Sequence, residues 1–441
     1  MHTPTQRTLF ANSCIQLFRN IVLGGLAMLA TCVAAASAEA PPSVEVRQLT
    51  HGPKHHFFGY IGHVRTIPWN ESGRYIVALE TDFQDHMPRP DEAASIVLID
   101  THNENKIRVV DQTRAWNFQQ GTMLYWNPRH PETQFFFNDR DLATNRIYTV
   151  LFDISADGSA NSLGKRIAEY RYDDASLGNS GVAQLGGSFL ALNYGRLARL
   201  RPVTGYPGAI DLTLDERTGR PNDDGVFLVD IATKRKTLLV SFAQLYEQLK
   251  TVRPDANGKP LFINHTLWSR NDRRIFFYVR ADFEKPEGER INVPFVIRPD
   301  GTGLTMLDHH LGGHPEWLDD VRMIGSRDDR QVVYDVEQRK FVETLGTPAV
   351  FPEPGGDKAL SPTEDWLVNG YRLKGSNFYT LYRFRDGANM RSPGFDQFGW
   401  TKGELRVDAA PCWNRDGTQI LFPSLAPDGK SRQLFVLTRK P

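Results

Sequence analysis

The stretch GHPEWLDDVRMI, residues 313–324, places a histidine and a proline before a tryptophan, followed by an acidic turn and an apolar run. Asp and Gly tolerate the backbone angles of tight turns, and the apolar run after the turn is typical of a β-strand. The same order of aromatic or apolar residue, polar turn and strand recurs along the chain, starting at Trp69, Trp126, Leu185, Trp268, Trp317, Leu360 and Trp413. The fold is therefore built from a repeated β unit.

A second hairpin is predicted between several of these copies, at residues 97–110, 227–240, 295–307 and 332–345. Two hairpins per copy make a four-stranded antiparallel blade, and the spacing between copies is typical of β-propellers. The sequence thus predicts an all-β fold, a seven-bladed β-propeller of four-stranded antiparallel blades, as a single domain over residues 41–441. We expect Trp317 in the core, an insertion near residues 201–225, and a short helix within residues 241–252.

The first 40 residues differ from the rest. Arg7 and Arg19 precede an apolar run at 21–36 that ends in small residues, as in a signal peptide of an exported protein. We expect residues 1–40 to be a signal peptide, no transmembrane segment after it, and a periplasmic or secreted protein. The alternative is a lipid anchor on Cys32. Cys412 is the only cysteine outside the first 40 residues, so no internal disulfide is expected.

The chain carries 52 basic and 52 acidic side chains, so no general positive charge is available to coat a nucleic acid. We expect no nucleic-acid partner, and a monomer. An acidic ligand would have to be held by a few placed residues. The GxSxG, GxxxxGK, HExxH and CxxC motifs are absent from the sequence, which disfavours serine hydrolases, nucleotide-binding proteins and zinc peptidases.

The residue three positions before each repeat start is expected near one mouth of the ring, on an inner strand. These positions hold Thr66, Met123, a residue near Val182, His265, His314, Asp357 and Ala410. His265, His314 and Asp357 could bind a divalent cation such as Mn, Ca or Zn, or could act as a base and its charge partner. The alternative is structural, with each imidazole bonded to a neighbouring blade.

Further candidates surround this set. Tyr60 and His63 are expected near the mouth. A sugar-binding wall is expected from Trp116, Phe118, Gln119 and Gln120, although a core role for Trp116 is an equal alternative. Arg196, Arg199 and Arg201 are expected along a basic strand, either facing substrate or forming an exposed charged edge. Residues 139–141 are expected to form a solvated turn or a salt-bridged loop.

Asn264-His265 and the 313–317 stretch resemble the oligogalacturonate lyase group of secreted propellers, with weaker similarity to propeller ulvan lyases. Residues 56–60, 115–121 and 193–202 resemble uncharacterised bacterial propellers near those lyases. The resemblance implies β-elimination on uronate-containing glycans, with His265 as base or charge stabiliser, Arg196 as partner of the uronate carboxylate, His314 as metal ligand and Asp357 as helper.

The sequence departs from that group in two places. The histidines expected from the last two blades are replaced by Asp357 and Ala410, and the position of the ulvan-lyase tyrosine holds Ser180. Another acid or base would then come from Tyr60, His63, Tyr194 or Tyr206. We expect an exported carbohydrate-active lyase acting on an acidic oligo- or polysaccharide. The alternatives are a non-catalytic periplasmic propeller that binds a glycan or a protein, and a hydrolase.

Overall fold

The structure is a computed structural model, and it describes residues 43–59, 66–155, 163–213 and 221–440. The chain divides into residues 1–40 and 41–441. The predicted signal peptide with Cys32, and the candidates Tyr60 and His63, lie outside the described residues. Within the described ranges, no helix has the length and apolar character needed to cross a membrane. Cys412 is a buried free thiol.

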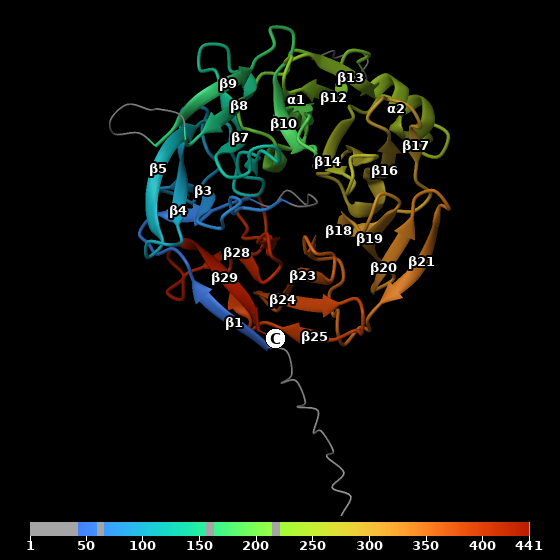
Figure 1. Ribbon diagram of the computed structural model, residues 1–441. Coiled ribbons are helices and arrows are strands. Elements are labelled where there is room, and N and C mark those ends of the chain that lie inside the picture. The colour runs from blue at the N-terminus through green and yellow to red at the C-terminus, as the bar shows by residue number, and fades with distance from the viewer. Residues whose placement is uncertain (1–42, 60–65, 156–162, 214–220, 441) are drawn as a thin grey trace, which may run out of the picture. The chain divides into compact units, whose positions relative to one another are not determined.

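The described residues from 43 to 440 form β-sheets that follow one another around a ring in chain order (Figure 1). Five of these sheets have four antiparallel strands. Their strands are, sheet by sheet: β2 (His55–Phe57), β3 (Tyr75–Thr81), β4 (Ala94–Asp100) and β5 (Lys106–Thr113); β6 (Tyr125–Trp126), β7 (Gln134–Arg140), β8 (Ile147–Asp153) and β9 (Lys165–Tyr170); β10 (Leu177–Val182), β11 (Ser188–Asn193), β12 (Gly225–Asp230) and β13 (Lys236–Ser241); β14 (Phe262–Trp268), β15 (Ile275–Ala281), β16 (Ile291–Ile297) and β17 (Thr305–Met306); β27 (Cys412–Trp413), β28 (Gln419–Leu425), β29 (Arg432–Lys440) and β1 (Ser43–Gln48).

The remaining nine strands form one continuous sheet. They are β18 (Gly312–Trp317), β19 (Arg322–Arg327), β20 (Arg330–Asp335), β21 (Lys340–Leu345), β22 (Asp357–Leu360), β23 (Trp366–Leu373), β24 (Ser376–Arg383), β25 (Asn389–Arg391) and β26 (Phe395–Asp396). The all-β propeller fold is confirmed. The prediction of seven four-stranded blades is wrong, because the described residues form five four-stranded blades and β18 joins β22 in parallel through the pair His314 and Asp357.

Repeat tryptophans connect several of the sheets to the preceding one. Four of them donate the indole N–H to a backbone carbonyl of the preceding repeat, at 2.7 to 3.0 Å: Trp126 to Pro68, Trp268 to Gly181, Trp317 to Leu267, and Trp413 to Ala359. A buried indole N–H needs such a partner, because an unpaired donor costs free energy. Trp317 is 0% exposed, so its predicted core position is confirmed.

The first strand of the described chain completes the last sheet. β1 pairs antiparallel with β29 from Ser43 opposite Lys440 to Gln48 opposite Phe435. Thr50 then donates its hydroxyl to Gln433 Oε1 at 2.7 Å. In Figure 1 the blue β1 accordingly lies beside the red β29. Strand pairing between the two ends of the domain closes the ring and gives hydrogen-bond partners to backbone groups that β29 would otherwise leave unpaired.

The insertion after β11 contains the principal departure from the predicted secondary structure. Residues expected to form a basic strand make the helix α1 (Tyr194–Leu200), followed by η1 (Pro202–Thr204). Asn193 caps α1, because its side chain accepts a hydrogen bond from the Arg196 N–H at 3.0 Å. An N-cap asparagine before a short amphipathic run was the sequence signal for this helix.

The predicted helix within residues 241–252 is confirmed as α2 (Phe242–Leu249). Ser241 and Gln244 form a capping box at its start, in which each side chain bonds the backbone of the other residue. Two further short turns of 3-10 helix are η2 (Pro254–Ala256) and η3 (Glu287–Glu289).

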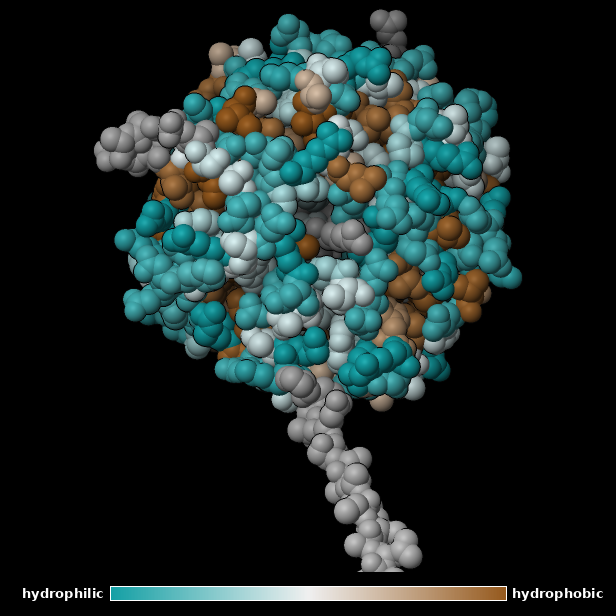
Figure 2. Space-filling model, in the orientation of Figure 1, coloured by the Kyte–Doolittle hydropathy of each residue, from teal (hydrophilic) through white to brown (hydrophobic). Residues whose placement is uncertain are grey.

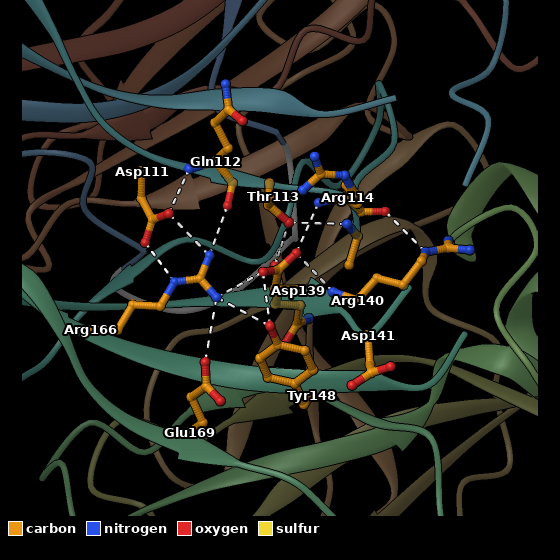
Figure 3. A network of polar contacts seen from close by, with 12 residues as sticks. Asp111, Gln112, Thr113, Arg114, Asp139, Arg140, Asp141, Tyr148, Arg166 and Glu169 are labelled. Carbon is orange, nitrogen blue, oxygen red and sulfur yellow. Dashed lines mark hydrogen bonds and ion pairs between the residues drawn. The ribbon is translucent and has the colours of Figure 1, made fainter. Parts of the chain in front are cut away.

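A polar network joins two neighbouring blades (Figure 3). Arg166 on β9 forms ion pairs with Asp111 on β5 and Asp139 on β7, both at 2.8 Å, and Tyr148 donates its hydroxyl to Asp139 at 3.0 Å. The prediction of a turn or loop at residues 139–141 is therefore corrected for Asp139 and Arg140, which are buried residues of a strand. A paired and buried carboxylate here indicates a structural role.

The face drawn in Figure 2 is mainly hydrophilic, with apolar residues scattered among polar ones. The described part of the chain exposes few large apolar side chains, among them Leu185 and Val109. Scattered apolar residues of this kind are normal for a protein surface and indicate no apolar docking face.

Candidate functional site

The candidate site forms where three inner strands carry His265, His314 and Asp357. His265 lies on β14 at an irregularity of the strand between Asn264 and Leu267, with a positive φ of 58°. Its N–H donates to the Asn264 side chain at 2.8 Å. A left-handed backbone at a non-glycine residue is strained, and the surrounding strand pairing must hold it in place.

A glycine lets the next two inner strands approach closely. Gly313 has a φ of 72°, and a Cβ atom at this position would lie 2.5 Å from the carbonyl oxygen of Gly355. Any other residue would therefore force β18 away from the segment that precedes β22. This close approach allows His314 and Asp357 to pair across the two strands.

His314 and Asp357 form a dyad. His314 Nδ1 contacts Asp357 Oδ1, and Asp357 Oδ2 accepts a hydrogen bond from the Ala410 N–H at 2.9 Å. Burial opposes ionisation of the Asp357 carboxyl, but the electrostatic interaction and the hydrogen bond with His314 outweigh it and lower the pKa of Asp357. The dyad thus consists of an ionised carboxylate that fixes the orientation of one imidazole.

The second imidazole lies beside the first. The ring centroids of His265 and His314 are 4.8 Å apart, with the rings inclined at 42°. Both rings line a pocket of about 160 Å³. The other lining residues are Gln119, Gln120, Arg201, Thr204, Asn264, Arg280, Phe283, Arg406 and Asp408.

Three guanidinium groups make this pocket electropositive. Burial, against an opposing effect of Tyr278 and together with the positive charge of Arg201, lowers the pKa of Arg280 to about 10. Burial also lowers the pKa of Arg201, with a second contribution from the charge of Arg406. Each of these arginines is therefore close enough to another for their positive charges to repel each other. Arg406 is the most compensated of the three, because it forms an ion pair with Asp408 at 2.7 Å.

Amide side chains complete the pocket wall. Gln119 donates to Asp408 Oδ2 at 2.9 Å, and Gln120 donates to Asn264 Oδ1 at 3.3 Å. Gln120, predicted to contact substrate, thus lines the same pocket as His265 and His314. Amides of this kind can bond the hydroxyl groups of a sugar.

The structure places four other predicted site residues away from this pocket. Arg196 is 2% exposed and donates from Nε to the Leu261 carbonyl at 2.6 Å, with Asp224 at 3.9 Å. Tyr194 is 1% exposed and stacks on Tyr206 at 4.3 Å. Both side chains are therefore held inside the protein. Their positions correct the expectation that Arg196 shares a hollow with the two histidines.

The other two are Trp116 and Arg199. Trp116 is 0% exposed and donates its indole N–H to the Glu92 carbonyl at 2.9 Å, so it belongs to the core. Arg199 forms an ion pair with Asp211 at 2.9 Å. Neither lines the pocket, and the sugar-wall alternative for Trp116 does not fit a fully buried ring.

Sequence reasoning missed Arg280 and Arg406 as members of the site, whereas Gln119 was predicted for a sugar-binding wall and does line this pocket. Arg280 had a signal, because it is a charged residue inside the otherwise apolar strand IFFYVRA of β15. Arg406 had none, because nothing in its local sequence distinguishes it from a surface polar residue.

The donor groups do not fit the predicted divalent cation. Over the described ranges, no group of three or more His, Cys, Asp and Glu side chains is arranged to hold a metal ion. Both oxygens of Asp357 are engaged, one by His314 and one by the Ala410 N–H. The guanidinium groups of the same pocket would repel a cation and attract an anion.

The sequence matches no protein-family model, and no curated protein matches it. Among solved structures, it is similar to the Swd1 β-propeller domain of Myceliophteria thermophila, with 11% identity and a TM-score of 0.45, over 90% of this chain and 99% of that one. TolB from Acinetobacter baumannii has 11% identity and a TM-score of 0.38, over 90% and 96% of the two chains. The β-propeller domain of the trilobed protease from Pyrococcus furiosus has 14% identity and a TM-score of 0.45, over 87% and 97%. The fold assignment therefore rests on the strand pairing described above.

Proposed function

We propose that this protein is an exported carbohydrate-active propeller that cleaves uronate-containing glycans by β-elimination. The observation that carries the proposal is the meeting of two imidazoles, one of them backed by a carboxylate, with three guanidinium groups in one pocket. β-Elimination needs a partner for the uronate carboxylate, a base for the C5 proton and an acid for the leaving O4.

The arginines supply the first requirement. A guanidinium fork matches a carboxylate and neutralises its charge, which makes the neighbouring C5 proton more acidic. Arg280 and Arg201 are the best candidates, because Arg406 already forms an ion pair with Asp408. Arg280 is positioned by a hydrogen bond from its Nε to Asn292 on β16 at 2.9 Å. A fixed guanidinium loses little entropy when it binds substrate.

The two imidazoles supply the base and the acid. The contact of His314 Nδ1 with Asp357 sets the tautomer, so that His314 takes up the C5 proton at Nε2 and Asp357 stabilises the imidazolium. The electron pair of the C5–H bond forms the C4–C5 double bond as the C4–O4 bond breaks. His265 donates a proton to O4. These roles differ from those implied by the family resemblance, in which His265 was the base and His314 a metal ligand.

The alternative is a propeller that binds an acidic glycan in this pocket without cleaving it. The pairing of Arg406 with Asp408, and the bonds of Gln119 and Gln120 to neighbouring side chains, favour a preformed binding surface. Such a protein would need the arginines but not the dyad.

Purified protein should be incubated with polygalacturonate, ulvan and chondroitin, and the ultraviolet absorbance of the new C4–C5 double bond followed. The proposal expects absorbance with at least one polymer, and its loss in the double variant His265→Ala, His314→Ala in protein that remains folded. Absence of unsaturated product with all three polymers, or full activity of the double variant, would refute the elimination chemistry. Retained binding of a polymer without product would instead support the non-catalytic alternative.

A further inference from the structure

The positive charge of the pocket continues beyond its lining residues. Phe283 lies on the pocket wall, and three guanidinium carbons lie close to the centre of its ring: those of Arg280 at 4.8 Å, Arg201 at 5.1 Å and Arg290 at 5.3 Å. Arg290 is not a lining residue of the pocket. Phe283 therefore connects the pocket to a further cation beside it. We name Arg406, Arg201, Arg280 and Arg290, in this order, the arginine track.

The positive charges of the arginine track are only partly balanced by neighbouring carboxylates. In the part of the chain that the structure describes, Arg201, Arg280 and Arg290 form no ion pair with an acidic side chain, and the carboxylates of Glu404 and Glu284 act on Arg201 from beyond ion-pair distance. Two of these arginines donate hydrogen bonds to neutral acceptors instead. Arg290 Nε donates to the Lys285 carbonyl at 2.6 Å, and Arg280 Nε donates to the Asn292 side chain. Like charges held this close repel each other, and binding of several anionic groups would relieve that repulsion.

Arg290 is held in position by its backbone. It directly precedes β16, and its carbonyl accepts a hydrogen bond from Arg253 at 2.9 Å. Its placement next to Phe283 therefore belongs to a structured segment. A cation fixed one side chain beyond the pocket suits a charge on the next unit of a chain-like ligand.

We propose that the arginine track binds at least two consecutive acidic units of a glycan, with Arg201 and Arg280 holding the unit beside the histidines and Arg290 holding the anionic group of its neighbour. The ligand class is then a polyanionic chain with a charge on adjacent residues, and a glycan with isolated uronates is excluded. This inference rests on the proposed function for the sugar chemistry, but it concerns binding and needs no turnover. The neighbouring charge can be a carboxylate or a sulfate.

The test is calorimetric titration of the full chain with galacturonate, with trigalacturonate, and with a chondroitin sulfate tetrasaccharide. We expect Arg290→Gln to weaken binding of the longer ligands by about 5- to 10-fold, as for one lost charge-assisted contact, and to leave binding of galacturonate unchanged. The salt dependence of oligosaccharide affinity should also fall in this variant. Arg298→Gln is the matched control, because Arg298 is exposed and follows the other end of the same strand β16.

The two oligosaccharides separate the sources of charge. A loss with trigalacturonate identifies a carboxylate as the second anion, and a loss with the sulfated tetrasaccharide alone identifies a sulfate. The inference is overturned if Arg290→Gln weakens galacturonate as much as the longer ligands, if it weakens none of them, or if the wild-type protein binds none of them. Binding with this pattern but without unsaturated product would refute the elimination chemistry and leave the track assignment standing.

Discussion

His314 and Asp357 are adjacent across a parallel strand pair that fuses two runs of antiparallel strands into one sheet. Their side chains contact each other through Nδ1 and Oδ1, and the Ala410 N–H holds the other carboxylate oxygen. A single pair of residues thus joins the sheet and builds the dyad of the candidate site. The glycine before His314 makes this approach sterically feasible.

Asp357→Asn tests the dyad. An amide can still accept the hydrogen bond from Ala410, but toward His314 it would present a donor and favour the tautomer that carries its proton on Nε2. We expect turnover to fall by about 100-fold or more with KM little changed, since substrate binding rests on the arginines. The pH profile of kcat should lose the limb that reports the base. A rise in KM with an unchanged kcat would contradict this role for Asp357.

Arg280→Gln and Arg196→Met test which arginine binds the substrate carboxylate: Arg280, which lines the pocket, or Arg196, which the family resemblance implied. Arg280 lines the pocket, so we expect its loss to raise KM about 10-fold, as for one charged contact to a carboxylate. Arg196 is buried against Asp224, so its loss should lower the free energy of unfolding by about 3 kcal/mol and leave KM unchanged in the protein that remains folded. Kinetics and urea unfolding of both variants provide the check, and the reverse pattern would restore Arg196 as the substrate partner.

Trp116→Phe distinguishes a core side chain from a sugar-binding one. The ring is fully buried and its N–H bonds the Glu92 carbonyl, so we expect a cavity and an unpaired carbonyl to cost about 1 to 3 kcal/mol of stability. Affinity for oligosaccharides should stay at the wild-type value. Weakened binding at an unchanged melting temperature would instead place Trp116 against the ligand.

Arg166→Met tests the network between two blades. Asp139 is buried, and it would lose its ion pair at 2.8 Å while keeping only the Tyr148 hydroxyl and backbone donors. Removal of one partner of a buried pair leaves an uncompensated charge, so we expect about 3 kcal/mol of destabilisation in urea unfolding. Arg108→Met on the exposed edge of β5 is the control, with an expected change within about 0.5 kcal/mol. Equal effects of the two substitutions would contradict a structural role for the network.

Lys358→Met gives a pH-dependent prediction. Lys358 is 1% exposed, and burial lowers its pKa from the usual 10.5 to about 7, against the opposing charge of Asp357. Between these two pKa values the unfolded chain binds a proton that the folded protein lacks, so the free energy of unfolding rises with pH. Below pH 7 the folded protein carries the buried charge and the contribution to stability is at its lowest.

We therefore expect Lys358→Met to stabilise the protein most at pH 6 and progressively less toward pH 10. The stabilisation at the two pH values should differ by up to about 5 kcal/mol. Lys374→Met, at an exposed lysine, is the control and should show no such trend. Urea unfolding at several pH values measures both. A difference between wild type and Lys358→Met that stays constant with pH would contradict the buried, neutral lysine.

Local sequence determined the strands and their turns. Each repeat carries an aromatic or apolar residue, turn residues and an apolar strand within a short window, so the β-propeller class, the core position of Trp317 and the helix α2 follow from neighbours in the chain. One misread segment was α1, where Asn193 was not taken as an N-cap and a charged run was given the alternation of a strand. Asp139 and Arg140, predicted in a turn or loop, belong to β7.

Only the tertiary structure decided how the sheets join and which cations surround the histidines. A parallel pairing between β18 and β22 depends on the distance between two strands that are not neighbours in any hairpin, and no local pattern encodes it. Repeat equivalence could place His265 and His314 on corresponding inner strands, but Arg201, Arg280 and Arg406 come from a helix end, a strand and a loop that have no common repeat position. Contacts between residues distant in sequence decide where these arginine side chains point and how deeply they are buried. Burial in turn determines how strongly their charges act on a ligand, so the convergence of the three arginines follows from packing.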